Sequence, residues 1–496
     1  MYPIYYLAIL AAGAVVELIP IQSSLASEDI SARMEQADAK LLITDNKFFE
    51  LSKRAAEQAG GIPLFVPENE HDLFGGDVPE FCGFYIDSEH EAADSPAFLN
   101  RTSGSTGGKL KTVVTTHAHF IATLEATIHT IPANTDPDVD VWLSTLSLGF
   151  FINAKLNIGL NILLGIPCVL MDRPFDVGNF DVIERHHITF LFIPPPVAAS
   201  IAGDDRTKGV DVSSVKWLLS AGASMHEGLQ KSVSRKLNNV HLDLEWGTTE
   251  TLLIAIHREG HASPQGSSGT LVNGIEARVI DTETGEDVGP NESGEILVRN
   301  SACRFAGYKN NESANKSTFD DQGWFHSGDF GYLDDQCSVY ITDRMKELIR
   351  VGDGYGVHIS AVELEAIIFE HPAVAQVIVV GVPDLETSMD RATAFVKLST
   401  EWVSQEDTAM QALEQWTKEK LTGLKALVGG IVILEAFPTI GFKINRRALK
   451  ALATVKRGLQ QVVPTSEGTL QAKAELPKLD LVAAKIVVPT PAAVAA

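Results

Sequence analysis

The sequence is poor in cysteine and in basic side chains. Its 496 residues include four cysteines, which lie far apart and form neither a CxxC pair nor a zinc-binding spacing. Lysine and arginine number 40 against 64 aspartate and glutamate residues, which gives a formal net charge of −24. An acidic surface repels nucleic acids and anionic membranes, so neither is expected as a partner. We predict reduced thiols and a cytoplasmic protein.

The sequence also lacks a long hydrophobic run. Residues 1–21 are apolar, but no basic segment precedes them, and Glu17 interrupts a run that is too short to cross a bilayer. We therefore expect no integral membrane segment. Hydrophobic residues make up 45% of the chain, enough for a large core, and the length suits two to four domain-sized units.

Four regions differ in their pattern. Up to about residue 245, apolar runs alternate with amphipathic segments, which predicts a large region of doubly wound α/β subdomains. From about residue 266, short strands flank the turn Thr284-Gly285 and predict a small antiparallel, barrel-like unit. Residues 345–450 read as a small α+β domain. Residues 451–496 are of low complexity and are expected to be disordered.

A loop of glycine, serine and threonine follows the apolar run at residues 97–99. Glycine lets backbone N–H groups close around an anion, hydroxyl groups add donors, and Lys109 or Lys111 adds positive charge. A solvated turn is the plain alternative. A Walker A motif fails, because Leu110 stands where a magnesium-binding Ser or Thr is needed. We predict that this loop holds a polyphosphate. Its residues are Thr102, Ser103, Gly104, Ser105, Thr106 and Gly107.

Five further segments with distinctive sequences lie at expected strand ends or turns. Each alone is also explained by a plain turn, a core tryptophan or a surface lysine. They are Ser220-Ala-Gly-Ala-Ser224, Glu245-Trp-Gly-Thr-Thr-Glu250, Gly323-Trp-Phe-His-Ser-Gly-Asp329, Asp343-Arg-Met-Lys-Glu347 and Pro438-Thr-Ile-Gly-Phe-Lys-Ile-Asn-Arg-Arg447.

In this order, and together with the phosphate loop, the segments resemble the adenylate-forming (AMP-binding) enzymes. These comprise acyl-CoA synthetases, aryl-CoA ligases, luciferases and peptide-synthetase adenylation domains. The resemblance covers about residues 5–450. It implies a large AMP-binding domain at 1–344 and a small mobile C-terminal domain at 345–450. It also implies that several tens of residues found at the start of relatives are missing here.

The resemblance assigns roles to individual residues. It implies that Glu250 holds Mg²⁺, that Lys346 is the hinge between the domains, and that Lys443, Thr249 and Glu250 are catalytic. The residues that it places around ATP are Thr102, Ser103, Gly104, Ser105, Thr106, Gly107, Lys111, Gly222, Ala223, Trp246, Gly247, Asp329 and Arg344, with Trp246 stacked on adenine and Asp329 on the ribose hydroxyls.

The implied activity is an acid–thiol ligase that uses ATP and Mg²⁺, with coenzyme A as acceptor. One alternative is a peptide-synthetase-like protein that passes the acyl group to a carrier thiol. Another is a catalytically poor nucleotide-binding relative. The second alternative is based on departures from the family's motifs: one extra residue before Lys111, Thr112 in place of glycine, and Phe442 in place of glycine before Lys443.

The substrate prediction rests on a missing carboxylate. Relatives that activate amino acids carry an aspartate just after the strand expected at residues 141–146, where it pairs with the α-ammonium group. Residues 141–171 contain no acid, and Phe150 and Phe151 could line an apolar pocket. We therefore predict an aryl or fatty acid. The alternative is that both phenylalanines are core residues and that another segment supplies a carboxylate.

Overall fold

The computed structural model describes most of the chain. The described residues are 2–20, 25–69, 82–102, 111–171, 173, 175–258, 264, 266–300, 305–352, 357–384, 389–440, 443–456, 462–464 and 470–472.

A seven-stranded sheet forms the centre of the large region. Its order is β12-β11-β10-β9-β8-β6-β7. The strands from β10 to β7 run parallel, whereas β11 and β12 add an antiparallel edge. The strands are β6 (Trp142–Ser144), β7 (Cys168–Leu170), β8 (Phe190–Phe192), β9 (Trp217–Ser220), β10 (Leu242–Thr248), β11 (Leu252–Ile256) and β12 (Thr270–Leu271).

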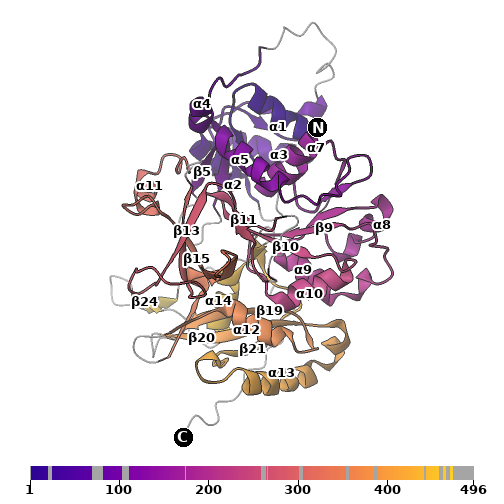
Figure 1. Ribbon diagram of the computed structural model, residues 1–496, viewed down its shortest axis with the longest axis vertical. Coiled ribbons are helices and arrows are strands. Elements are labelled where there is room, and N and C mark those ends of the chain that lie inside the picture. The colour runs from indigo at the N-terminus through magenta and orange to yellow at the C-terminus, as the bar shows by residue number, and fades with distance from the viewer. Residues whose placement is uncertain are drawn as a thin grey trace.

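Helices cover both faces of this sheet (Figure 1). Along β9, Trp217 and Leu219 point into one core and Leu218 into the other, because side chains alternate along a strand. The first core is closed by α5 (His117–Ile128) and the helical segment 151–164, the second by α8 (Val182–His186), α9 (Pro195–Gly203) and α10 (Glu227–Lys236). The predicted doubly wound α/β arrangement is confirmed.

A smaller layer precedes the central sheet in the chain. Strand β4 pairs with β1 on one side and β5 on the other, and β2 pairs with β3. The elements are α1 (Tyr2–Ala11), β1 (Val16–Glu17), α2 (Ser27–Ala37), β2 (Leu42–Ile43), α3 (Phe49–Gln58), β3 (Leu64–Phe65), α4 (Glu89–Asp94), β4 (Pro96–Arg101) and β5 (Thr112–Thr116).

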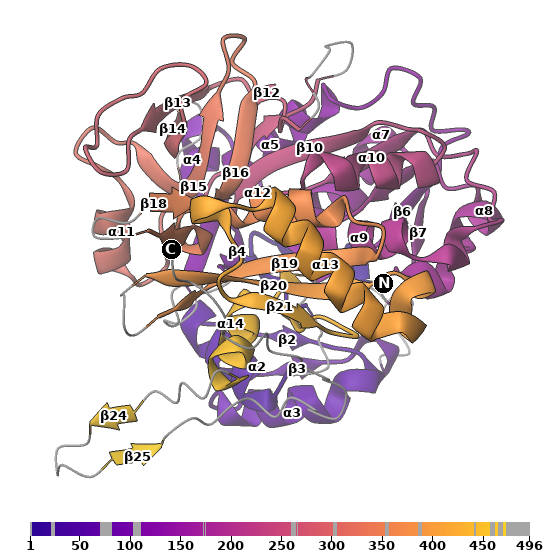
Figure 2. The ribbon, with the colours of Figure 1, turned by 90° about the horizontal axis from the view of Figure 1, so that it is seen from below.

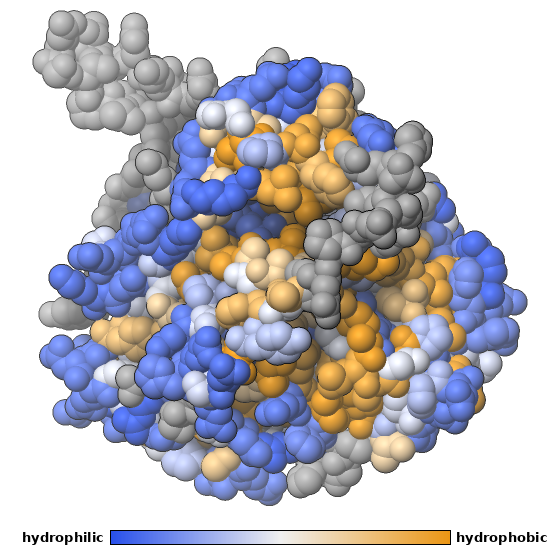
Figure 3. All heavy atoms as spheres, turned by 90° about the horizontal axis from the view of Figure 1, so that it is seen from above, coloured by the Kyte–Doolittle hydropathy of each residue, from blue (hydrophilic) through white to orange (hydrophobic). Residues whose placement is uncertain are grey.

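Apolar side chains gather on the face of the molecule that carries α1 and α7 (Asn161–Leu164) (Figure 3). Ile4 is 54% exposed on α1, and Leu163 is 62% exposed on α7. No helix of the described residues has the length and hydropathy needed to span a membrane.

The expected antiparallel unit is a four-stranded sheet in the order β13-β14-β15-β16. Its strands are β13 (Ile275–Ile280), β14 (Gly294–Asn300), β15 (Phe325–Leu333) and β16 (Val339–Arg344), and α11 (Glu312–Thr318) precedes β15. Strand β16 ends at the residues that lead into the small domain.

The C-terminal domain is a three-stranded sheet with helices on both faces (Figure 2). Helices α12 and α13 close one core, and α14 closes the other. The elements are β17 (Ile349–Val351), β18 (Val357–Ile359), α12 (Ala361–Phe369), β19 (Val374–Pro383), β20 (Asp390–Leu398), α13 (Glu406–Lys420), β21 (Gly430–Ile433), β22 (Thr439–Ile440), β23 (Lys443–Ile444) and α14 (Arg446–Lys456). Most of the tail after residue 456 lies outside the described residues; β24 (Val462–Pro464) and β25 (Leu470–Ala472) form an antiparallel pair.

Candidate active site

The predicted site residues gather where the parallel strands β9 and β10 end. In open α/β sheets this carboxyl edge is where ligands bind. Trp246 on β10 donates its indole N–H to Asp329 Oδ2 on β15 at 2.8 Å. Arg344 on β16, the cross-strand partner of Asp329, places its Nε 2.7 Å from Asp329 Oδ1. Three segments that are distant in the sequence therefore converge on one carboxylate.

Asp329 is a buried charge. It is 1% exposed, and its backbone N–H donates to Ser327 Oγ at 3.0 Å. Burial raises the pKa of Asp329 above its ordinary value, although Arg344 and the Trp246 indole oppose that shift. Each carboxylate oxygen has a lone pair beyond the one already used, so Asp329 retains acceptor capacity for hydroxyl groups. Trp246, expected on adenine, is 5% exposed and belongs to the core at this edge.

Lys443 reaches the same place from the small domain. It begins β23, which pairs with β22 in a short hairpin. Burial and the positive charges of Arg344 and Lys346 lower the pKa of Lys443 to about 8, while Asp329 opposes the shift. Lys443 is therefore within electrostatic range of Asp329 and Arg344, the predicted ribose-binding residues. The expected hinge residue Lys346 shares this environment, and burial and Arg344 lower its pKa as well.

Two sets of contacts fix the position of the small domain and its hairpin. Asp343, the residue before Arg344, accepts hydrogen bonds from Ser360 Oγ at 3.1 Å and from the backbone N–H of Ala361 at 2.8 Å, so a residue of β16 caps helix α12. Arg446, which follows the Lys443 hairpin, donates to Glu365 Oε1 at 2.9 Å and to the Val379 carbonyl at 2.6 Å.

Glu250, the predicted magnesium ligand, lies in the turn between β10 and β11. Tyr308, which is 5% exposed, donates its hydroxyl proton to Glu250 Oε1 at 2.7 Å. The ammonium group of Lys111 sits 4.4 Å from the centre of the Tyr308 ring. A carboxylate oxygen is the hard ligand that Mg²⁺ prefers, and one oxygen of Glu250 is free of the Tyr308 bond. The residues present therefore fit a magnesium ion.

Small residues line the neighbouring strand ends. Gly222 has φ +94°, a conformation that favours glycine, and Ala223 beside it is exposed. At Gly247 a Cβ would meet the Leu252 carbonyl oxygen at 1.8 Å, so the strand needs glycine for its own pairing. Ser220 Oγ, at the end of β9, is buried with no hydrogen-bond partner in the described part of the chain. An unpaired buried hydroxyl at this edge suits a polar ligand.

The phosphate loop is only partly described. Ser103, Gly104, Ser105, Thr106 and Gly107 lie outside the described residues. Thr102 accepts the Lys111 backbone N–H on its Oγ1 at 3.3 Å, so the two ends of the loop meet. Thr249 lies partly exposed in the turn beside Glu250.

The predicted apolar pocket wall contains a buried ion pair instead. The helical segment 151–164 contains the π-helical turn Ala154–Leu160 between α6 (Phe151–Asn153) and α7. Lys155 in that turn pairs with Glu245 on β10, and the two side chains are 4% and 9% exposed. Phe151 packs on Phe98 and Phe120 with ring centres 5.4 and 5.9 Å apart, which is a core role.

Four of the residues described above were missed by the sequence reasoning: Tyr308, Lys155, Glu365 and Arg446. Each acts through a partner far away in the chain, 58 residues for Tyr308 and Glu250, 90 for Lys155 and Glu245, and 81 for Arg446 and Glu365. No local spacing signals such pairs.

Comparison with known proteins agrees with this architecture. The AMP-binding enzyme family matches residues 1–309, and the AMP-binding enzyme C-terminal domain matches residues 363–441. The chain has the fold of ATP-bound MatB from Rhodopseudomonas palustris, with a TM-score of 0.75, 20% identity, and coverage of 91% of this chain and 86% of that one. An anthranilate CoA ligase in complex with anthranoyl-AMP gives a TM-score of 0.75, 21% identity, and coverage of 92% and 85%.

Curated relatives are similar in sequence. A 4-coumarate–CoA ligase 1 of Narcissus pseudonarcissus is 30% identical over 86% of this chain and 77% of its own length. A 4-coumarate–CoA ligase 3 of Oryza sativa subsp. japonica is 30% identical over 72% of this chain, and the match spans 64% of that ligase. The fold and the site define an adenylate-forming protein. The chain belongs to the AMP-binding enzyme family.

Proposed function

We propose that this protein is an acid–thiol ligase that activates a carboxylic acid with ATP and transfers the acyl group to coenzyme A. The observation that carries the proposal is the gathering of Lys443, Arg344 and Lys346 around Asp329. Arg344 and Lys346 come from the junction of the domains, and Lys443 comes from the small domain. Such a cluster suits a substrate with several negative charges.

In the first step, the substrate carboxylate attacks the α-phosphorus of ATP and pyrophosphate leaves. Two anions approach one another, so the transition state concentrates negative charge. Lys443 would bridge the carboxylate and the α-phosphate in its charged form. Asp329 would accept the ribose hydroxyls and Arg344 would hold the ribose side of the nucleotide, with Gly222 and Ala223 beside the adenine.

Glu250 and Tyr308 would act at the phosphates of ATP through a bound metal ion. Bound Mg²⁺ supplies charge neutralisation on the phosphates of ATP. Glu250 would hold the ion, and the Tyr308 hydroxyl would keep that carboxylate oriented. Lys111, packed on the Tyr308 ring, places a cation at the end of the phosphate loop, and Thr249 adds a hydroxyl donor beside Glu250.

In the second step, a thiolate attacks the acyl carbonyl and AMP leaves. We propose that the small domain first turns about Lys346, as the family resemblance implies, which takes Lys443 away. That motion must break the bonds from Asp343 to the start of α12, because the two partners lie on opposite sides of the hinge.

For the substrate we propose an acid without an α-ammonium group, an aromatic acid first. Glu245 is a carboxylate that another segment supplies next to residues 150–164. Lys155 already neutralises it, and an ammonium group that recruited Glu245 would leave Lys155 buried and unpaired. The names of the 4-coumarate, anthranilate and benzoate ligases among the similar proteins agree with an aromatic acid.

The products give the direct test. The protein is incubated with ATP, Mg²⁺, coenzyme A and a cinnamate- or benzoate-type acid, and AMP and the thioester are measured. Equal amounts of both are expected. Lys443→Ala should lose most of the product while binding ATP nearly as well, because Lys443 acts mainly in the transition state. Normal turnover by that variant would refute the role of Lys443.

A further inference from the structure

A cluster of two histidines and an aspartate lies away from the nucleotide site. His241 immediately precedes β10, Asp243 is on β10, and His257 follows β11, the antiparallel neighbour of β10. Residues two apart on a strand face the same side, so His241 and Asp243 project together toward His257. The ligand atoms of all three lie within 4.8 Å of one another.

The distances are close to those of a metal site. Asp243 Oδ1 is 2.8 Å from His257 Nδ1 and 3.7 Å from His241 Nε2. Ligands about 2.0–2.1 Å from a tetrahedral zinc ion are about 3.3 Å apart. The two distances to Asp243 each differ from this value by about half an ångström. The His241 and His257 rings are stacked with centres 5.3 Å apart, so His241 must also turn toward the ion, and its side chain is 52% exposed.

The surroundings already orient the ligands. His257 Nε2 lies 3.0 Å from the Ser267 carbonyl oxygen, and Asp243 Oδ2 accepts the Trp217 indole N–H at 2.9 Å. If Nε2 donates its proton to Ser267, the Nδ1 lone pair of His257 points at Asp243 Oδ1. A cation between these atoms removes that repulsion, as a second proton would. Outer hydrogen bonds of this kind are typical of metal-bound histidine and carboxylate.

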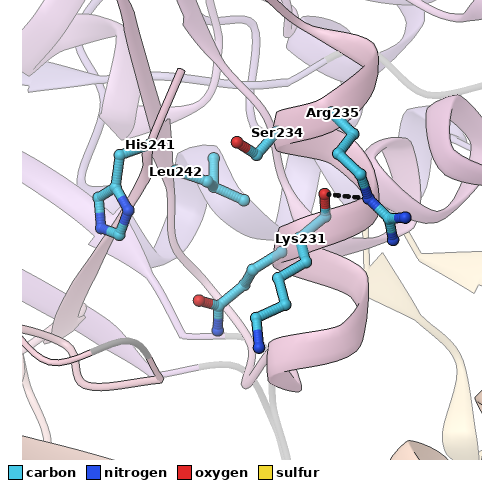
Figure 4. A pocket seen from close by; sticks show the side chains of 6 residues that line it. Lys231, Ser234, Arg235, His241 and Leu242 are labelled. Carbon is cyan, nitrogen blue, oxygen red and sulfur yellow. Dashed lines mark hydrogen bonds between the residues drawn. The ribbon is translucent and has the colours of Figure 1, made fainter. Parts of the chain in front are cut away.

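The cluster has an entry path. His241 borders a cavity of about 380 Å³ whose other side is formed by α10, with Lys231, Ser234 and Arg235 (Figure 4). Water from this cavity can complete the coordination.

We propose that His241, Asp243 and His257 bind a divalent first-row transition cation, with zinc favoured by the ligand set, at the end of the central sheet opposite the nucleotide site. Two imidazoles and one carboxylate suit zinc and not calcium or magnesium, which prefer oxygen ligands. The ion would tie the start of β10 to the residues after β11 and so stabilise this end of the sheet.

The test uses the tag-free full chain after removal of metals with a chelator. Zn²⁺ is titrated by calorimetry in the absence of ATP and acid, so the result does not depend on ligase activity. We expect one equivalent of tightly bound zinc, and a visible absorption band of low-coordinate cobalt when Co²⁺ replaces it. Zinc should also raise the Tm by several degrees.

His241→Ala should weaken binding by at least about tenfold and abolish the rise in Tm, and Asp243→Asn should do the same. His129→Ala, an exposed histidine at the end of α5, is the matched control and should bind like the parent. Because His241 is exposed, its variant tests the site even if Asp243→Asn folds poorly. The proposal is overturned if the parent binds no stoichiometric zinc, or if His241→Ala binds as the parent does.

Discussion

The low pKa of Lys443 gives adenylation a characteristic pH dependence. Burial, Arg344 and Lys346 lower the pKa of Lys443 from 10.5 to about 8, and the proposed bridge between carboxylate and α-phosphate needs the charged form. The charged fraction is therefore about 90% at pH 7 and about 10% at pH 9. The kcat/KM of acid adenylation should be level below the pKa and fall about tenfold per pH unit well above it.

The assay is the first half-reaction alone, measured from pH 7 to 10 as acid-dependent ATP–pyrophosphate exchange. Coenzyme A is omitted, because its thiol titrates in the same range. ATP phosphates should raise the pKa of Lys443 in the complex, so kcat should fall at higher pH than kcat/KM does. Lys443→Arg keeps its charge across this range. Its rate should be low but nearly independent of pH. An alkaline fall near pH 8 in Lys443→Arg, or its absence in the parent, would refute this reasoning.

Three further predictions concern the supports of the site. Glu250→Gln should raise the Mg²⁺ concentration that gives half-maximal adenylation, because one hard anionic ligand is lost; a titration identical to the parent's would contradict this. Tyr308→Phe should raise it about tenfold by removing the 2.7 Å bond that orients Glu250, whereas Tyr332→Phe, the matched control, should not. Glu365→Gln should destabilise the fold by about 3 kcal/mol in urea denaturation, because the partly buried Arg446 loses its charge partner. Glu370→Gln, at the exposed residue that follows the same helix, should be neutral. Equal denaturation midpoints for these two variants would count against the role of the pair.

The architecture could be predicted because its signals are local. Alternating strand and helix periods predict the doubly wound region. The ordered motifs predict which strand ends carry Trp246, Glu250, Asp329 and Arg344, and the structure brings these segments to one edge. The helical segment 151–164 shows what local signals do not predict. The π-helical turn in this segment does not alter the spacing of apolar residues along the sequence, so that spacing does not reveal it. This turn carries Lys155, which pairs with Glu245.

Contacts between distant segments could not be predicted. Residues 141–171 contain no acidic residue, but Glu245 on β10 pairs with Lys155 and makes the predicted apolar pocket wall partly charged. The His241–Asp243–His257 cluster could not be predicted for the same reason. Cysteine spacing is a local signal of a metal site, whereas this cluster joins two strands through their antiparallel pairing.

The measurement that tests the central claim most directly is ATP–pyrophosphate exchange with a panel of acids. The panel contains cinnamate-like, benzoate-like and medium-chain fatty acids beside the proteinogenic amino acids. The account predicts exchange that requires an acid without an α-ammonium group, is strongest with an aromatic acid, and is lost in Lys443→Ala. Strong exchange with an amino acid alone, or ATP binding without exchange for any acid, would contradict it.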